Sequence, residues 1–292
     1  MIPLAEAEHF VRAPNWTWYI LFYFFLAGLS GGSCVIAALL RLYRDPAGEA
    51  AARVGYYVAF PTMLVCPVLL TLDLRQPLRF WHMLVNTTPG QLAPIFKYWS
   101  PMSVGAWALV VFGGLVTVSF LDAWRRDRKG IERAGLLATL WSVATALAGL
   151  FIAGYTGVLL AVSNQPVWSD TWALGGLFLA SGLAGSAALL GWLAGHRAAA
   201  RDRAAAFASA ERFFLLLEGA LVVAFVVTLV PAGTLGRAFG FPWILLWLLA
   251  LACALPWLLR RVRVLAAPGL MLTTLALISV LAVRAAVIFS AQ

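Results

Sequence analysis

The sequence predicts an all-α integral membrane protein with eight transmembrane helices, arranged as two four-helix bundles. Hydrophobic residues make up 63% of its 292 positions and charged residues only 11%, whereas about a quarter of a soluble domain is charged. The mean hydropathy is +0.90. Apolar residues fall in runs of about 20, the length that an α-helix needs to cross a bilayer. These runs are too long and too uniformly apolar for the strands of a membrane barrel.

Eight such runs follow one another along the chain. We place the spans at Trp16–Leu40, Val54–Leu72, Met102–Leu121, Ala134–Val162, Trp172–Ala194, Phe213–Val230, Trp243–Leu259 and Ala267–Phe289. Residues 1–162 are expected to form the first bundle and residues 163–292 the second, whereas 1–133 and 134–292 are not separate domains. The start of the chain lacks the basic and apolar regions of a cleavable signal peptide, so we expect the first span to direct insertion.

The net charge of +9 follows the order of the spans. With eight spans the connections alternate between two sides, and 15 of the 21 Lys and Arg residues fall on one side. The positive-inside rule places that side in the cytoplasm, and both termini and the connection from Asp73 to Lys97 on the outer side. The basic connections are therefore interpreted as topology signals, and no nucleic acid is expected as a partner.

The cysteines and histidines argue against a metal centre in this chain. An iron–sulfur cluster normally needs four cysteine thiolates. The three cysteines form no CxxC motif and are Cys34, Cys66 and Cys253. A membrane haem usually takes histidines from deep within facing helices, whereas His9, His82 and His196 lie in connections or at the end of a span. We expect no haem and no metal here, with a single ligand from His82 or His196 left open.

Small residues mark the first and fifth spans. The segment Phe25–Ser33 (FLAGLSGGS) is paralleled by Phe178–Ser186 (FLASGLAGS), with one residue inserted. This similarity is typical of a duplicated four-helix unit. Small residues let helices approach closely, so the glycines from Gly28 onward either pack helices together or form a flat wall for a ring. Tyr23, about one turn outward, is either a packing residue or a ligand contact.

The second span carries two prolines and ends in a carboxylate. Pro61 and Pro67 each remove a hydrogen bond from the helix, and kinked membrane helices commonly line a cavity. Asp73 at the end of the span has two interpretations. It is either an interfacial partner for Arg75 or Arg79, or a proton acceptor for a bound ligand, because burial and neighbouring charges tune a carboxylate for proton exchange.

The connection Thr71–Trp107 gathers polar chemistry between apolar spans. It contains Arg79, His82 and Lys97 among several tryptophans. From Leu78 onward, apolar and polar residues alternate at helical spacing, which predicts a short amphipathic helix in the membrane interface. A connection of about 30 residues is usually functional or disordered, and its tryptophan content argues against disorder.

Polar residues also occur in later spans. Tyr155 lies between glycines (GYTG), which leaves room for a flat ligand over its ring unless the tyrosine belongs to the core. Asn164 lies in the second outer connection, which has no Lys or Arg. Glu218 lies within the sixth span, where a carboxylate marks function by default; it either joins a proton path from the inner side or reaches the inner interface. Arg284 in the last span either snorkels to the interface or pairs with a carboxylate.

Four motifs, in this order, resemble the NrfD/polysulfide reductase membrane-subunit family. They are GLSGG in the first span, LDLRQPLRFW after the second, SPMSVGAW into the third and GYTGVLLAVSNQPVW at the end of the fourth. The resemblance implies an eight-helix anchor without haem in the bacterial cytoplasmic (inner) membrane, exchanging electrons with menaquinone or ubiquinone. The implied partners on the outer face are a ferredoxin-like iron–sulfur subunit and a catalytic subunit, commonly a molybdopterin enzyme.

For the site, the resemblance implies a quinone near the outer face. A tyrosine of the fourth span that contacts the quinone matches Tyr155, and an acid near the end of the second span matches Asp73; a histidine of some members aligns with Tyr23. The hypothesis is a quinone-reactive subunit with Asp73 and Tyr155 as catalytic residues. The expected quinone-binding residues are Tyr23, Gly28, Asp73, Arg79, His82, Tyr155 and Asn164.

In this hypothesis, Arg75, Arg79 and Lys97 pair with acidic residues of the iron–sulfur partner. Two other classes stay open. One is a secondary transporter or proton-translocating module without redox chemistry of its own, which the repeat and the kinked second span allow. Against it, the polar groups gather at one membrane face rather than at the midplane of both halves. The other is a passive membrane anchor.

Overall fold

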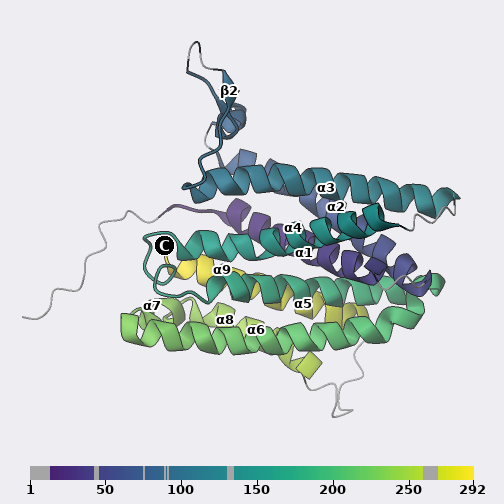
Figure 1. Ribbon diagram of the computed structural model, residues 1–292. Coiled ribbons are helices and arrows are strands. Elements are labelled where there is room, and N and C mark those ends of the chain that lie inside the picture. Colours follow the sequence, from purple (N-terminus) through teal and green to yellow (C-terminus); the bar gives the residue numbers. More distant parts are fainter. Residues whose placement is uncertain are drawn as a thin grey trace, which may run out of the picture.

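The long helices lie side by side and form a bundle (Figure 1). The computed structural model describes residues 14–42, 46–74, 76–88, 90, 92–129, 135–258 and 269–292. In chain order the elements are α1 (Trp18–Leu42), α2 (Pro46–Asp73), the 3-10 helix η1 (Pro77–Met83), β1 (Val85–Asn86), β2 (Ala93–Pro94), α3 (Pro101–Lys129), α4 (Leu136–Ala161), α5 (Leu174–Gly195), the 3-10 helix η2 (Ala198–Arg203), α6 (Ala204–Ala232), α7 (Leu235–Phe239), α8 (Ile244–Leu258) and α9 (Gly269–Ser290). We call the end where α2 finishes the Asp73 end, and the end where α1 finishes the Arg41 end.

Seven helices of the described residues are long and apolar enough to cross a membrane, namely α1 to α6 and α9. The predicted all-α membrane fold is confirmed to this extent. The predicted span Trp243–Leu259 corresponds to α8, which is apolar but has 15 residues, fewer than the roughly 20 that a span needs. Because residues 259–268 lie outside the described residues, the eighth span and the division into two four-helix bundles stay predictions.

Several helices extend beyond the predicted spans. α2 begins at Pro46 rather than Val54, and α3 continues to Lys129 rather than Leu121; α6 likewise begins earlier than predicted. The added turns are rich in alanine, arginine and glutamate, which favour a helix without favouring lipid. Hydropathy therefore finds the apolar part of each helix and misses its polar ends.

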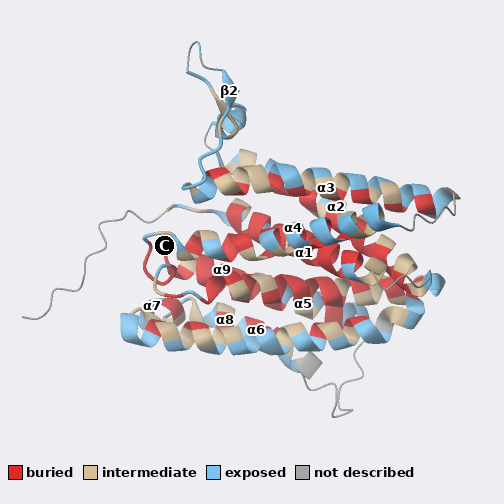
Figure 2. Ribbon diagram, viewed as in Figure 1, coloured by how far each residue is buried: buried red, intermediate tan, exposed pale blue. Residues whose placement is uncertain are grey.

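The core lies where α1 and α5 cross, and Figure 2 shows buried residues concentrated on these helices and α9. A Cβ atom on Gly182 would lie 2.9 Å from the carbonyl oxygen of Gly28. The Ser186 hydroxyl donates to the Leu29 carbonyl oxygen at 3.0 Å. The two similar small-residue segments thus pack on each other, and Gly28 has a packing role rather than that of a wall for a ring.

Arg284 of α9 is fully buried between α1 and α5. Its guanidinium donates to the carbonyl oxygens of Phe24 at 2.7 Å and Phe178 at 2.8 Å, and to the Ser181 hydroxyl at 2.9 Å. Snorkelling to the interface, one of the two predicted roles, is therefore wrong. Glu218 of α6 is also buried, with no hydrogen-bond partner for either carboxylate oxygen among the described residues. It does not reach the interface, and its part in a proton path stays a prediction.

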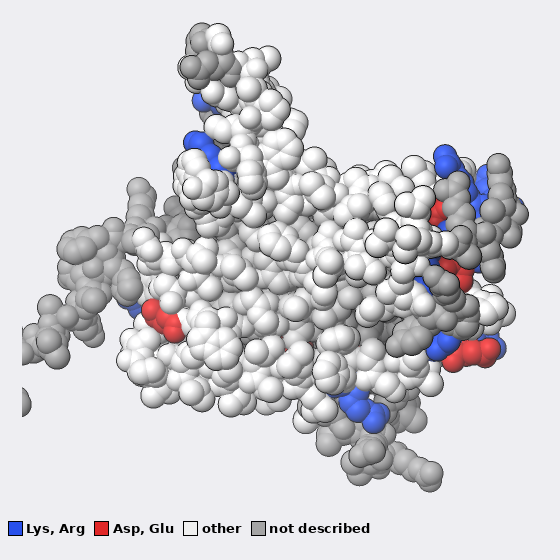
Figure 3. Space-filling view, in the orientation of Figure 1, with Lys and Arg blue, Asp and Glu red and all other residues white. Residues whose placement is uncertain are grey.

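Charged side chains tie α1, α2 and α3 together at the Arg41 end. Arg41 pairs with Glu49 and with Asp122, each at 3.2 Å. Arg126 pairs with Asp122 at 2.9 Å and lies 3.6 Å from Glu49. Red and blue atoms gather at this end, on the right of Figure 3. Basic residues expected to be topology signals therefore also hold three helices together, through partly buried ion pairs.

Between α2 and α3 the chain forms an arm, defined as the described part of residues 76–100, which stands away from the helices (Figure 1). Its strands pair antiparallel, with Val85 opposite Pro94. The Trp107 indole N–H donates to the Ile95 carbonyl oxygen at 2.8 Å and fixes the base of the arm to α3. In place of the predicted amphipathic α-helix there is a 3-10 helix followed by a two-stranded ladder, because so short a run is marginal as an α-helix.

Candidate functional site

A cavity of about 480 Å³ opens at the Asp73 end, among α1, α2, α3, α4 and the arm. Its size is within the range of about 300–1,000 Å³ that is usual for small-molecule sites. The walls are mostly apolar and include Phe24 of α1, Met63 and Pro67 of α2, Leu109 of α3 and Leu159 of α4. α2 runs continuously through both of its prolines. The space therefore suits a largely apolar ligand that meets only a few polar groups.

Tyr23, Asp73 and Tyr155 all line this cavity. The three side chains come from α1, α2 and α4, so the fold brings together residues that are far apart in the sequence. Asp73 is partly exposed, whereas both phenols are buried. The Thr17 hydroxyl donates to Asp73 Oδ1 at 3.3 Å, so the turn before α1 orients the carboxylate. A proton acceptor thus lies near solvent, with two hydroxyl donors deeper in the same space.

Tyr155 is held against the beginning of α3. Its hydroxyl donates to the carbonyl oxygen of Pro101. Gly105 lies beside the phenol, where a Cβ atom would overlap the ring. Phe151 stacks on the other side, with 5.5 Å between ring centroids. The position of the phenol therefore depends on the absence of a side chain at residue 105.

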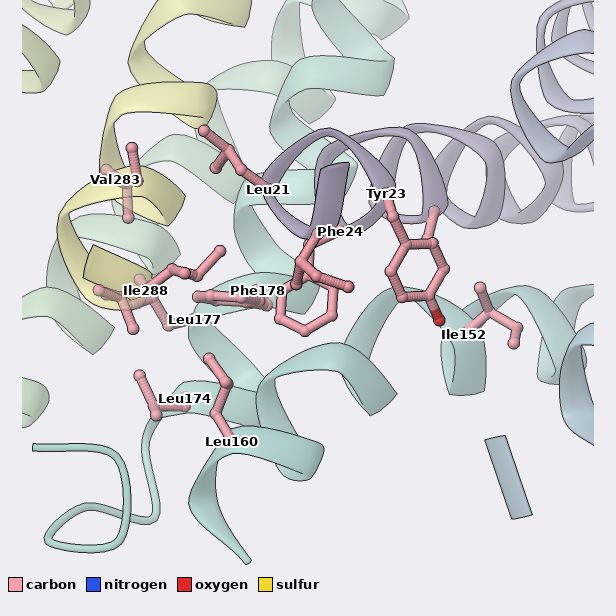
Figure 4. Close-up of a cluster of buried hydrophobic side chains, with 14 of the residues drawn as sticks. Leu21, Tyr23, Phe24, Ile152, Leu160, Leu174, Leu177, Phe178, Val283 and Ile288 are labelled. Carbon is pink, nitrogen blue, oxygen red and sulfur yellow. The ribbon is translucent and has the colours of Figure 1, made fainter. Parts of the chain in front are cut away.

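Tyr23 contributes to the core and to the cavity at once. In Figure 4 its ring extends from α1 towards Ile152 of α4. Only 4% of the residue is exposed, yet it forms part of the cavity wall. The two roles proposed from the sequence, packing and ligand contact, are compatible at this position.

The other residues predicted to bind the ligand do not line the cavity. Gly28 lies at the crossing of α1 and α5. Arg79 and His82 are exposed on η1, and Asn164 is exposed in the connection after α4. The arm instead contributes apolar side chains, among them Phe80.

Two contributors had weak signals in the sequence. Gly105 stands inside the SPMSVGAW motif, where a glycine among larger residues marks a close approach between helices. Thr17 precedes the first helix and resembles a helix-capping residue. Neither position shows from sequence alone that it contacts Tyr155 or Asp73, because these contacts join different helices.

The comparison with protein families decides where this chain belongs. The family described as Polysulphide reductase, NrfD, matches residues 6–292. This chain belongs to the NrfD family. Together with the seven long apolar helices, membership of the NrfD family makes it a multi-pass membrane protein.

Individual NrfD-family relatives are more distant, and two of them are by name the C subunits of reductases. The identity to that of the Wolinella succinogenes polysulfide reductase is 28% over 181 residues, covering 58% of this chain and 54% of the relative. The identity to that of the Salmonella typhimurium tetrathionate reductase is 28% over 156 residues, covering 53% and 42%. Protein NrfD of Escherichia coli is 24% identical over 202 residues, covering 63% and 60%. The chain therefore spans about half the length of the curated relatives that it matches.

Proposed function

We propose that this chain is the quinone-reactive membrane subunit of a bacterial reductase complex, passing electrons between menaquinol or ubiquinol and an iron–sulfur partner subunit. The main support is the cavity that Tyr23, Asp73 and Tyr155 share. Two of the relatives are by name the C subunits of a polysulfide and a tetrathionate reductase. A place in a multi-subunit reductase follows from that kinship.

The cavity fits a quinone chemically. A quinone has a flat ring with two carbonyl oxygens and an apolar tail, and the cavity offers apolar walls with hydroxyl and carboxylate groups at a few points. When bound, a quinone supplies two-electron redox chemistry coupled to two protons. The chain's own residues then have to orient the ring, exclude water and handle protons.

Each polar group has a distinct task in this proposal. Asp73 accepts or releases a proton at its carboxylate oxygens, because it is the one of the three that is partly exposed. Tyr155 positions the ring through its hydroxyl, which already has a fixed direction toward the Pro101 carbonyl oxygen. Tyr23 closes the wall on the α1 side. The apolar surroundings exclude water and so strengthen each hydrogen bond to the ligand.

The proposed orientation places the Asp73 end and both termini on the periplasmic side of the inner membrane. The charge asymmetry of the connections supports this orientation. In the proposed complex, a ferredoxin-like partner covers the mouth of the cavity and a catalytic subunit, of the molybdopterin class, lies beyond it. A cluster of that partner then receives or delivers electrons one at a time.

Replacing Tyr155 by Phe is expected to lower quinol-dependent turnover of the purified complex about 10- to 100-fold, because a positioned hydroxyl is lost while the ring stays. Tyr57→Phe is the matched control, since its hydroxyl binds Asp127 outside the cavity. Stopped-flow turnover with a soluble quinol analogue, together with a gel that shows which subunits are present in the complex, makes the comparison. Full turnover in Tyr155→Phe would show that this phenol has no part in the reaction, and binding of no quinone by the wild-type complex would leave a passive anchor.

Replacing Gly105 by Ala is expected to lower kcat/KM for quinol roughly 10-fold, about 1.4 kcal/mol of transition-state stabilisation. The new methyl group would overlap the Tyr155 ring and push it from its place. Gly114→Ala on the same helix is the control, since a Cβ atom there meets nothing within 4 Å. Equal effects of the two alanines on kcat/KM would contradict the close contact.

A further inference from the structure

The arm exposes an unusual amount of apolar surface. Leu78 is 87% exposed and Leu92 is 79% exposed, and the aromatic residues Phe96, Tyr98 and Trp99 are exposed as well. Figure 2 shows the arm almost entirely in the colour of exposed residues. Contiguous apolar surface of this kind marks contact with a membrane or a protein partner. The question is what covers it.

The position of the arm places it at the edge of the bilayer. It joins α3 at Pro101, one residue before the apolar stretch Met102–Leu121 begins. Twenty helical residues rise about 30 Å, the thickness of the hydrocarbon core. The arm then runs across the direction of the helices rather than along it (Figure 1). An element that leaves a span at its end and runs sideways lies at the depth of the lipid headgroups.

The charges of the arm are of one sign. Its described residues include Arg79 and Lys97 and contain no Asp or Glu. In Figure 3 the blue atoms of the arm gather along the edge turned away from the flank of α3, and the opposite edge is white. An apolar edge toward the hydrocarbon and a basic edge toward the headgroups is the distribution of a surface-bound amphipathic element. Exposed tryptophan and tyrosine are the residues enriched at that depth.

We propose that the arm is a membrane-surface element that binds anionic phospholipid headgroups through Arg79 and Lys97. Because Phe80, Met83 and Leu84 of the same arm line the cavity, its contact with lipid also sets one wall of the space beside α2 and α3. These cations then serve the lipid rather than an acidic protein partner. The proposal does not depend on the quinone reaction, since it concerns where the arm lies.

Spin labels test the location of the arm in the complex purified from native membranes and reconstituted into nanodiscs of phosphatidylcholine with phosphatidylglycerol. The native cysteines are buried, so Leu78→Cys and Leu92→Cys can be labelled selectively. Ser169→Cys, exposed in the connection between α4 and α5, is the control. We expect arm labels to be relaxed more by oxygen than by a water-soluble nickel chelate, and the control label to show the reverse. Arm labels that meet the chelate as freely as the control, or that are shielded from both agents, would overturn the proposal.

A charge substitution tests the headgroup contact. In the double variant Arg79→Gln, Lys97→Gln, native mass spectrometry of the complex is expected to show at least one fewer retained phosphatidylglycerol molecule than in wild type. Arg237→Gln, which removes an exposed cation of α7 outside the arm, is expected to retain the wild-type number. Unchanged lipid in the double variant contradicts the proposal. So does loss of the partner subunits with lipid unchanged, because that result assigns the cations to protein docking.

Discussion

Asp73→Asn is expected to lower quinol-dependent turnover about 100-fold, near the low end of the effect of losing a general acid or base. Asparagine keeps an acceptor oxygen for the Thr17 hydroxyl, 3.3 Å from Asp73 Oδ1 in the wild type, but it cannot take up a proton. The fold at this end should therefore persist while proton exchange fails. The measurement is steady-state oxidation of a quinol analogue by the intact complex.

The control for Asp73 is Asp202→Asn, which removes an exposed carboxylate on η2. It is expected to turn over at the wild-type rate. Thr17→Val offers a graded case, because it leaves the carboxylate but removes the hydroxyl that orients it, and a loss of a few-fold is expected. If Asp73→Asn turns over normally with the complex intact, proton exchange at this residue is excluded.

Arg284→Met is expected to destabilise the protein by about 2–4 kcal/mol, since hydrogen bonds to a charged donor contribute about 1.5–3 kcal/mol each in water and less between membrane helices. Methionine keeps much of the side-chain volume but loses the donors to Phe24, Phe178 and Ser181. Thermal unfolding in detergent can be followed with a thiol-reactive dye, because the cysteines are buried in the folded protein. The unfolding midpoint should fall.

Two variants show whether the loss comes from the hydrogen bonds. Arg284→Lys retains a positive charge but cannot reach α1 and α5 with two separate nitrogen atoms, so it should be destabilised nearly as much as Arg284→Met. Arg237→Met, at an exposed site, should unfold like wild type. A stable Arg284→Met protein would mean that helix packing alone holds α9 in place.

The sequence was sufficient for the fold class because lipid imposes a simple requirement. A span needs about 20 apolar residues, and hydropathy located seven helices that the structure contains. The polar ends of α2 and α3 escaped because their residues favour helix while disfavouring lipid. The ladder of the arm escaped because two-residue strands leave no periodic pattern.

Part of the candidate site was predictable and part was not. Asp73 and Tyr155 were selected through motifs, and both line the cavity. Arg79, His82 and Asn164 were selected because they lie in the predicted outer connections, and they are exposed outside it. Nearness along a connection does not fix the direction of a side chain. Gly105 shows the reverse case, since its role depends on a tyrosine fifty positions away.

The bonds of Arg284 also bear on how the protein matures. Phe24 is among the first membrane residues to leave the ribosome, and its partner Arg284 is made 260 positions later. The indole of Trp168 likewise waits for the carbonyl oxygen of Val287. Early helices must therefore persist in the bilayer as loosely associated segments until α9 is inserted. A stalled or truncated chain lacking α9 would expose unsatisfied surfaces on α1 and α5, which makes it a natural target for membrane quality-control proteases.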